Sequence, residues 1–267
     1  LMMAANAAVR VITRLEPQLE YGNGILSLGI QTDAQGIAGD VRDVVCVRAA
    51  NGWQIGISCK HNHHAVKHSR LSATIDFGQE WLGIPCSKEY FDTVVPIFHE
   101  LRDMRTRAIN EHRPLPLWSD IPDKSNRYYM PILNAFLQEL RRLAESDPTV
   151  PGKLIGYMLG KYDFYKVITD DKKRTTRIEA INLEGSLNKP ANGHRSIVDV
   201  AKLKLPTRFY HMGMVPHSDN KVEIVCDEGW TLSMRIHNAS SKVEPSLKFD
   251  VQLISLPANV HAQVEPW

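Results

Sequence analysis

The sequence lacks the features that would place it in a membrane or hold it together by cross-links. No apolar run approaches the length of about 20 residues that a membrane-spanning helix needs, and no signal peptide is visible. Cysteine is scarce, and no two cysteines show CxxC spacing; the four are Cys46, Cys59, Cys86 and Cys226. We therefore expect no membrane partner, and buried free thiols in a reducing cytosol.

An excess of charge of one sign is also missing. The formal net charge is +2 over 267 residues, so bulk charge does not indicate a nucleic-acid partner. The charge is unevenly distributed, however, because no acidic residue occurs from Val44 to Ile75 while basic side chains and histidines are frequent there. A second basic cluster lies at 172–177. Local patches of this kind suit contacts with phosphate groups, although a solvated face is the alternative.

Helical periodicity is concentrated in the first part of the chain. Helices are predicted over 4–21, 62–72, 88–110 and 126–146, the one over 62–72 being short and basic. Ser87 is the predicted N-cap of the third. From about residue 150 a short helix over 153–159 is followed by predicted strands at 164–169, 177–183, 207–212, 221–226, 230–236 and 247–256. The first residues, LMMAANAAVR, have the composition of a helix interior, so we expect the sequence to begin inside a longer natural chain.

The segment 39–72 predicts a hairpin that joins two residues of complementary chemistry. Asp43 precedes a strand-type run at 44–47, and a second run at 53–57 leads to Lys60 after a turn. Such a hairpin brings a carboxylate and an ammonium group together at one edge of a sheet. The carboxylate can hold a divalent metal and the lysine can orient or activate water, which suits phosphodiester hydrolysis.

This arrangement resembles the core of the PD-(D/E)XK nuclease superfamily, which has a central mixed sheet flanked by helices. The resemblance makes Asp43 and Lys60 the catalytic pair, and we prefer Asp43 to Asp40 because it directly precedes the apolar strand. The residue two before the lysine is usually Asp or Glu in that superfamily, but here it is Ser58. A second acid would then come from elsewhere. Asp76 and Glu80 are the candidates for further metal ligands, and Glu20, on the first helix, is a candidate catalytic acid.

Polar residues that could contact DNA follow the hairpin. The run HNHH at 61–64 invites a zinc site, but no cysteine or carboxylate lies at zinc-finger spacing from it. A segment that contacts phosphates or bases is the reading we prefer, and an exposed loop without a role is its competitor. A histidine general base is a further alternative, but it would leave Asp43 and Lys60 unexplained. The DNA-binding candidates are His61, Asn62, His64, Lys67, His68 and Arg70.

A second group of DNA-binding candidates lies in the C-terminal part. In the run WTLSMRIHN, apolar residues alternate with polar ones, which predicts a half-buried strand. Arginine reads guanine well and asparagine reads adenine. The candidates are Arg235, His237, Asn238 and Lys248. A polar sheet face that meets only solvent would show the same pattern.

Three stretches resemble the HaeIII family of type II restriction endonucleases: GISCKHNHHAVKHSRLS, DFGQEW and RIHNASSKVEPSLKFD. The resemblance covers about residues 40–256. The sequence changes from helix-rich to strand-rich near 148–152, so we expect a nuclease core over 1–150 and a strand-rich part over 151–267 that recognises DNA, unless the two share a single core. The resemblance implies an α/β fold with a PD-(D/E)XK-like core. It also implies Mg²⁺-dependent cleavage of double-stranded DNA at GGCC, in the cytoplasm of a bacterium or archaeon.

Other readings of the same residues remain open. One is a DNA-binding module with a degenerate nuclease core that does not cleave, since Ser58 departs from the superfamily pattern. Another is a repair or mobile-element nuclease of the same fold. Cleavage of both strands of a palindrome would suit a two-fold homodimer, although some such enzymes act as monomers.

Overall fold

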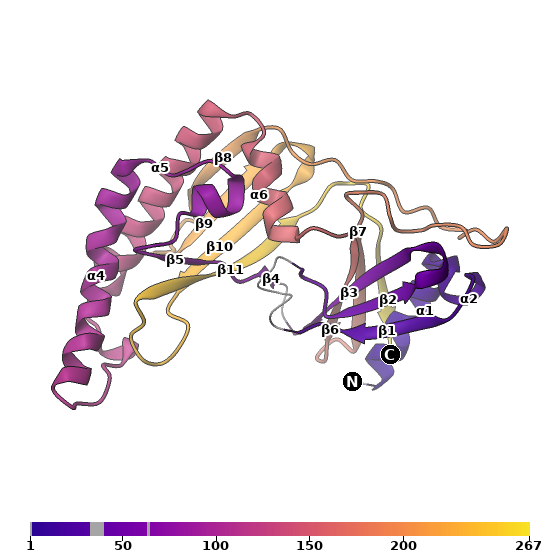
Figure 1. The fold of residues 1–267 in the computed structure, drawn as a ribbon, viewed down its shortest axis with the longest axis horizontal. Coiled ribbons are helices and arrows are strands. Elements are labelled where there is room, and N and C mark those ends of the chain that lie inside the picture. The colour runs from indigo at the N-terminus through magenta and orange to yellow at the C-terminus, as the bar shows by residue number, and fades with distance from the viewer. Residues whose placement is uncertain (1, 33–39, 63–64) are drawn as a thin grey trace. The chain divides into compact units, whose positions relative to one another are not determined.

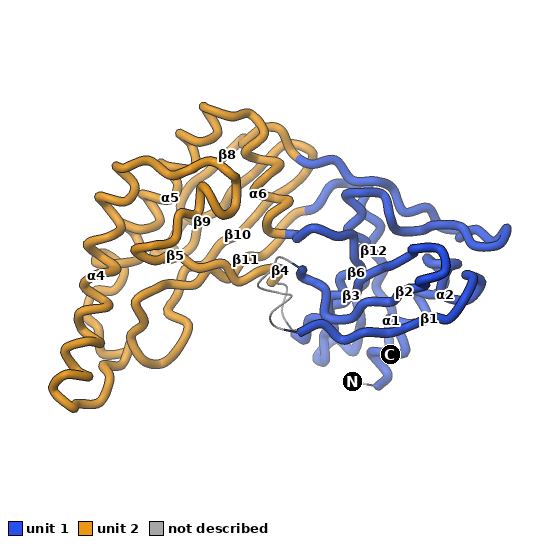
Figure 2. The backbone as a smooth tube through the Cα atoms, in the orientation of Figure 1, with its two compact units in different colours: residues 1–64, 159–205, 256–267 blue, residues 65–158, 206–255 orange. Residues whose placement is uncertain are grey.

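The chain folds into two compact units, each built around a six-stranded sheet. The structure is a computed structural model and describes residues 2–32, 40–62 and 65–267. Unit 1 comprises residues 1–64, 159–205 and 256–267, and unit 2 comprises residues 65–158 and 206–255 (Figure 2). The α/β class predicted from the sequence is confirmed. The units interleave along the chain instead of meeting at one boundary near residue 150, because strands from the second half pair with strands from the first.

Unit 1 is a mixed sheet with a helix on one face. Its strands lie in the order β1-β2-β3-β6-β7-β12, and every neighbouring pair is antiparallel except β3 and β6, which are parallel (Figure 1). The strands are β1 (Leu26–Ile30), β2 (Val44–Arg48), β3 (Trp53–His61), β6 (Phe164–Asp170), β7 (Thr175–Ile181) and β12 (Ala262–Pro266). The two helices are α1 (Met2–Leu15) and α2 (Pro17–Tyr21).

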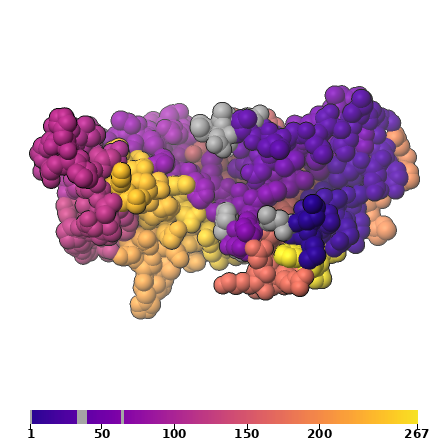
Figure 3. All heavy atoms as spheres, turned by 90° about the horizontal axis from the view of Figure 1, so that it is seen from below, coloured from indigo at the N-terminus to yellow at the C-terminus, as the bar shows by residue number. Residues whose placement is uncertain are grey.

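The core of unit 1 lies between α1 and one face of this sheet. Val11, Ile12 and Leu15 of α1 form one buried cluster with the sheet residues Ile55 and Val167. Figure 3 shows the N-terminal helix in indigo beside the C-terminal strand in yellow. Apolar residues alternate with polar ones along β3, so this packing fixes which side chains of β3 point away from α1.

Unit 2 packs helices against one face of an antiparallel sheet. Its strands lie in the order β4-β11-β10-β9-β8, and β5 also pairs with β11. The strands are β4 (Ala65–Lys67), β5 (Arg70–Ser72), β8 (Phe209–Met214), β9 (Lys221–Cys226), β10 (Thr231–His237) and β11 (Ser246–Ser255). The longer helices are α4 (Lys88–Asn110), α5 (Met130–Ser146) and α6 (Val150–Leu159). Short helical turns are η1 (Ala49–Asn51) in unit 1 and η2 (Gly78–Leu82), η3 (Trp118–Asp120), η4 (Ser125–Tyr129) and η5 (Asp227–Gly229) in unit 2. Phe136 of α5 packs against Phe249 of β11 with ring centroids 5.2 Å apart.

Most predicted elements are present, with one clear exception. The helix over 88–110 is confirmed, and Ser87 caps it by accepting a hydrogen bond from the Tyr90 N–H at 3.2 Å. The predicted basic helix over 62–72 is wrong, because the described part of this segment forms β4 and β5, which pair with β11. Ala65, Val66 and Leu71 are buried there, so pairing with a distant strand overrides local helix propensity.

The cysteines and the membrane-spanning potential bear on two expectations from composition. All four cysteines are free thiols, and Cys46 and Cys226 are buried as expected, but Cys59 is exposed and Cys86 is partly exposed. Within the described ranges, no helix is both long enough and apolar enough to cross a membrane.

A buried carboxyl group joins α1 to the later part of unit 1. Glu16 is fully buried, and its Oε1 accepts hydrogen bonds from the Tyr165 hydroxyl at 2.7 Å and the Asn188 N–H at 2.6 Å. Its Oε2 has no hydrogen-bond partner in the part of the chain that the structure describes. Burial raises the pKa of Glu16 from 4.5 to about 7, although these hydrogen bonds oppose the shift. The fold therefore favours the protonated acid.

We expect Glu16→Gln to stabilise the protein at alkaline pH only. Because the pKa of Glu16 is higher in the folded chain, its full contribution to stability is present below pH 4.5 and is lost as the pH rises through 7. Glutamine keeps an acceptor oxygen and carries no charge. The free energy of unfolding should rise by about 2–3 kcal/mol at pH 8 and change little near pH 4.5, as measured by urea denaturation. An equal change at both pH values would contradict this account.

Candidate active site

The β2–β3 hairpin brings Asp43 and Lys60 together on the face of the unit 1 sheet that points away from α1. The Asp43 N–H donates to the Ile57 carbonyl at 2.8 Å, just beyond the last β2–β3 pair, which joins Val44 and Ile57. The Lys60 Nζ lies 3.8 Å from the Asp43 Oδ2. The sequence predicted this proximity, and the structure confirms it.

The two oxygen atoms of the Asp43 carboxylate differ in their contacts. Its Oδ2 accepts hydrogen bonds from the Cys59 N–H at 2.6 Å and the Ser58 hydroxyl at 3.3 Å. Its Oδ1 has no hydrogen-bond partner within the described ranges, and the side chain is 49% exposed. By contrast, Asp40 is engaged by Arg42 at 2.7 and 2.8 Å. Asp43 is therefore the carboxylate that can offer an oxygen to a cation.

The same sheet face continues across β6 and β7 with charged residues that were not singled out from the sequence. Lys166 pairs with Ser58 across the parallel strands, and Glu179 pairs with Lys166 in turn. Lys166 is 1% exposed and Glu179 is 6% exposed. The signal that could have revealed them is a single lysine in the middle of the apolar strand FYKVIT. We call Asp43, Ser58, Lys60, Lys166 and Glu179 the charged row.

A magnesium ion fits this site as a cation with few protein ligands. Among the described residues, no three His, Cys, Asp or Glu side chains are arranged to hold a metal. Mg²⁺ usually keeps several waters and binds through one or two carboxylates together with substrate phosphates. The open Oδ1 of Asp43 meets that requirement for one carboxylate.

The three acids suggested as companions of Asp43 belong to different parts of the fold, two to unit 2 and one to unit 1. Asp76 lies in unit 2, and its carboxylate accepts hydrogen bonds from the Gln79 N–H at 2.9 Å and the Cys86 N–H at 3.0 Å. Glu80 is exposed on η2, also in unit 2. Glu20 is exposed at the end of α2 and lines an apolar cavity of about 660 Å³, together with residues of α1 and with Cys59, Lys60 and His61 of β3. None of the three makes a hydrogen bond or ion pair with Asp43 within the described ranges.

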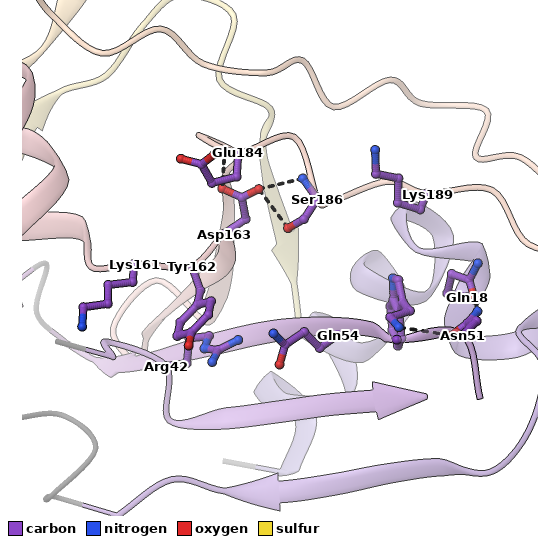
Figure 4. Close-up of a pocket in the computed structure, with 12 residues that line it drawn as sticks. Gln18, Arg42, Asn51, Gln54, Lys161, Tyr162, Asp163, Glu184, Ser186 and Lys189 are labelled. Carbon is purple, nitrogen blue, oxygen red and sulfur yellow. Dashed lines mark hydrogen bonds between the residues drawn. The ribbon is translucent and has the colours of Figure 1, made fainter. Parts of the chain in front are cut away.

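A polar pocket of about 440 Å³ lies on the same unit 1 sheet, near the start of β3. Figure 4 shows Gln54 and Lys161 lining it and the Tyr162 ring beside Arg42. The Arg42 guanidinium lies 3.9 Å from the centre of that ring, and its side chain packs over Gly56, where a Cβ atom would come within 1.8 Å of it. Gly56 thus lies on β3 between Gln54, which lines the pocket, and Ser58, which belongs to the charged row.

The candidates of the HNHH run are tied to a neighbouring turn. The His61 Nε2 lies 2.6 Å from the Asp171 Oδ2, and this contact lowers the pKa of Asp171. The Asn62 Oδ1 accepts from the Asp171 N–H at 3.0 Å. Both residues therefore lie next to Lys60 at the end of β3, fixed to the β6–β7 turn. His64 lies outside the described residues.

The remaining DNA-binding candidates, apart from Lys67 and Asn238, gather on one face of the unit 2 sheet. Strand register sets Arg70 beside Lys248 and Lys248 beside His237. One step along, Arg235 pairs with Asp250 at 3.2 Å, and the His68 Nδ1 lies 3.6 Å from the same carboxylate. This group of Arg70, Lys248, His237, Arg235 and His68 is called the basic face below.

Lys67 and Asn238 differ from these candidates because their polar groups are used within the protein. The Lys67 Nζ donates to the Tyr157 carbonyl at 2.8 Å and lies over the Tyr157 ring. The Asn238 amide donates to the Ser240 and Lys242 carbonyls at 2.6 and 2.7 Å, and it accepts from the Glu244 N–H at 3.1 Å. Asn238 thus shapes the turn between β10 and β11.

Comparison with known proteins identifies the family. The family described as HaeIII restriction endonuclease matches residues 1–257. The type II restriction enzyme HaeIII of Haemophilus aegyptius is 42% identical over 265 residues, which is 99% of this chain and 81% of that protein. This chain belongs to the HaeIII restriction endonuclease family. The resemblance read from the sequence is thereby confirmed, and the chain is a restriction endonuclease, an enzyme that cleaves DNA at specific sites. No solved structure matches it.

In this HaeIII-family enzyme, loss of one of the two hydrogen bonds to the Asp43 carboxylate should slow cleavage without abolishing it. Ser58→Ala removes the longer of the two hydrogen bonds to the Asp43 Oδ2 and leaves the one from the Cys59 N–H. One hydrogen bond is worth about 1 kcal/mol, so we expect the cleavage rate to fall only by roughly five-fold. Rates measured in a single turnover would check this. Complete loss of cleavage in a folded Ser58→Ala protein would show that Ser58 acts directly in the reaction.

Proposed function

We propose that this enzyme hydrolyses both strands of DNA at GGCC with Mg²⁺, and that the catalytic pair is Asp43 and Lys60. The observation that supports this most is the 3.8 Å separation between the Lys60 Nζ and the Asp43 Oδ2, beside an open carboxylate oxygen. The target sequence is inferred from the family and not from the geometry.

In this proposal each residue of the hairpin has a separate task. The Asp43 Oδ1 holds the metal, while the Cys59 N–H and the Ser58 hydroxyl fix the orientation of the carboxylate. The Lys60 ammonium is 17% exposed, so it can reach the scissile phosphate and orient the attacking water. When bound, Mg²⁺ would neutralise charge that develops on the phosphate and lower the pKa of a bound water.

A second acid is still part of the proposal. Of the three candidates, Glu20 is the one that belongs to unit 1 with Asp43, and it lines a cavity that Lys60 also lines. Asp76 and Glu80 remain candidates, although Asp76 accepts several backbone hydrogen bonds. The scissile phosphate itself can supply further oxygen ligands. We also propose a two-fold homodimer, since a palindromic site presents the same sequence to each subunit. The free cysteines suit action in the reducing cytoplasm of a bacterium or archaeon.

Two substitutions test the catalytic pair. Lys60→Ala removes the ammonium group and Asp43→Asn removes the anionic metal ligand; each should abolish Mg²⁺-dependent cleavage. Binding to a GGCC duplex in Ca²⁺ should change little for Lys60→Ala. Cleavage would be followed on phage DNA, with sequencing of the ends to identify the site.

The controls separate the alternatives. Lys161→Ala removes an exposed lysine of the polar pocket and should leave cleavage at a measurable rate. Near-native cleavage by the Lys60→Ala protein would overturn its assignment. A native protein that binds DNA and never cuts it would favour the non-cleaving module, and ends scattered over many sequences would favour a repair or mobile-element nuclease.

The basic face is proposed to bind DNA, with Arg235 and His237 near bases and the segment around Arg70 on the backbone. His61 and Asn62 would contact the backbone beside the cleavage site. Arg235 is 49% exposed, and its pair with Asp250 leaves further donors of the guanidinium available. Lys67 and Asn238 remain candidates, but their internal hydrogen bonds make them weaker ones.

Base reading and backbone binding can be told apart by specificity. Arg235→Ala should weaken binding to GGCC DNA by roughly 1–3 kcal/mol and change non-cognate binding little. Arg70→Ala should weaken both DNAs alike and lower the salt dependence by about one unit of slope. Binding would be measured in Ca²⁺ across a salt series. Equal weakening of both DNAs by Arg235→Ala would show that Arg235 does not read bases.

A further inference from the structure

Lys166 carries a buried charge that the proposed cleavage chemistry does not use. Its side chain is 1% exposed, and strand register places it beside Ser58 on the sheet face of the charged row. Burying an ammonium group costs free energy unless a counter-charge and hydrogen bonds offset the cost. Methionine has a similar length and would fill the space without that cost, so the charge itself needs a physical explanation.

Glu179 supplies the counter-charge on the far side of Lys166. The two residues are paired across β6 and β7, and Glu179 is 6% exposed. The Glu179 Oε1 also accepts a hydrogen bond from the Arg177 Nε at 2.7 Å. Burial lowers the pKa of Lys166 to about 8; Glu179 opposes this shift, and the positive charges of Lys60 and Arg177 add to it. Lys60 and Lys166 therefore repel each other.

The four charges lie across the sheet in a symmetric order, with the two ammonium groups in the middle and a carboxylate on each outer side: Asp43, Lys60, Lys166 and Glu179. Each ammonium group faces a carboxylate on one side and a like charge on the other. If Lys166 were uncharged, Glu179 would compete with Asp43 for the Lys60 ammonium.

We propose that Lys166 is a positioning residue, which keeps Lys60 directed at Asp43 by repelling its ammonium group and by pairing with Glu179. This inference rests on the proposed role of Lys60 in cleavage. Lys166 is only 1% exposed, too deeply buried to touch DNA, so any effect on cleavage passes through neighbouring residues.

Lys166→Met tests the proposal by removing the charge and keeping the length of the side chain. A displacement of about 1 Å in a reacting group can cost on the order of 100-fold in rate, so we expect single-turnover cleavage at saturating protein to fall about 10- to 100-fold. Affinity for GGCC DNA in Ca²⁺ should not change. Lys166→Arg keeps the charge and should retain more of the cleavage rate than Lys166→Met.

The double variant Lys166→Met with Glu179→Gln gives the sharpest readout. It also removes the carboxylate that would attract Lys60, so it should recover most of the rate lost in Lys166→Met. A purely structural role would restore thermal stability together with the rate, whereas a positioning role restores the rate in proteins whose thermal stability is already unchanged. Thermal unfolding of each protein checks that the comparison is made between folded enzymes.

Several outcomes would overturn the proposal. They are native cleavage by Lys166→Met, loss of cleavage that the double variant does not recover, and failure of both Lys166→Met and Lys166→Gln to fold, which would show that the charge serves the fold. The Lys60→Ala protein separates this inference from the proposed function. If Lys60→Ala is inactive and Lys166→Met is normal, only the inference fails; if Lys60→Ala cleaves normally, the proposed function fails.

Discussion

The register of the β2–β3 pair is the constraint on which the site depends. Side chains alternate between the two faces of a strand, so a slip of one residue would turn Lys60 towards α1 and away from Asp43. The turn that fixes this register is locally specified. Gly52 adopts φ 68°, a conformation that favours glycine, and the Asn51 side chain accepts a hydrogen bond from the Trp53 N–H at 3.1 Å. Burial of Trp53 and Ile55 then holds the same face of β3 against α1.

In the proposed function, the two units divide the requirements of a site-specific nuclease between two sheets. In unit 1 the face of the sheet opposite α1 carries the charged row, where a carboxylate and an ammonium group lie side by side. In unit 2 the helices cover one face of the sheet, and the other presents the basic face. Each sheet therefore has one face that stabilises the fold and another that is available for chemistry or for DNA.

The parts of this arrangement that could be predicted from sequence are the local ones. Asp43 and Lys60 belong to one hairpin, so the turn and the strand pattern between them were sufficient. The helix over 88–110 was equally accessible, because its cap and its periodicity are both local. The family was readable from the long stretches around Lys60 and Arg235.

What could not be predicted depends on pairing between distant segments. Lys166 and Glu179 join the charged row only through the parallel pairing of β3 with β6, more than a hundred residues away along the chain. The segment 62–72 was expected to be a helix, since nothing in its sequence indicates that β11 will pair with it. Likewise, an asparagine side chain can recognise a base, so the sequence favoured Asn238 as a DNA contact. Only the structure shows that its amide group makes hydrogen bonds within its own turn.

The location of the metal is the central claim of this account, and affinity cleavage tests it most directly. Fe²⁺ would replace Mg²⁺ in the protein bound to GGCC DNA, and ascorbate with peroxide would generate radicals that cut the polypeptide near the metal. Mass spectrometry of the fragments should locate the cuts around Asp43 and around Ser58–Lys60, and the Asp43→Asn protein should lose both. Cuts confined to other segments, with none near Asp43, would contradict the account.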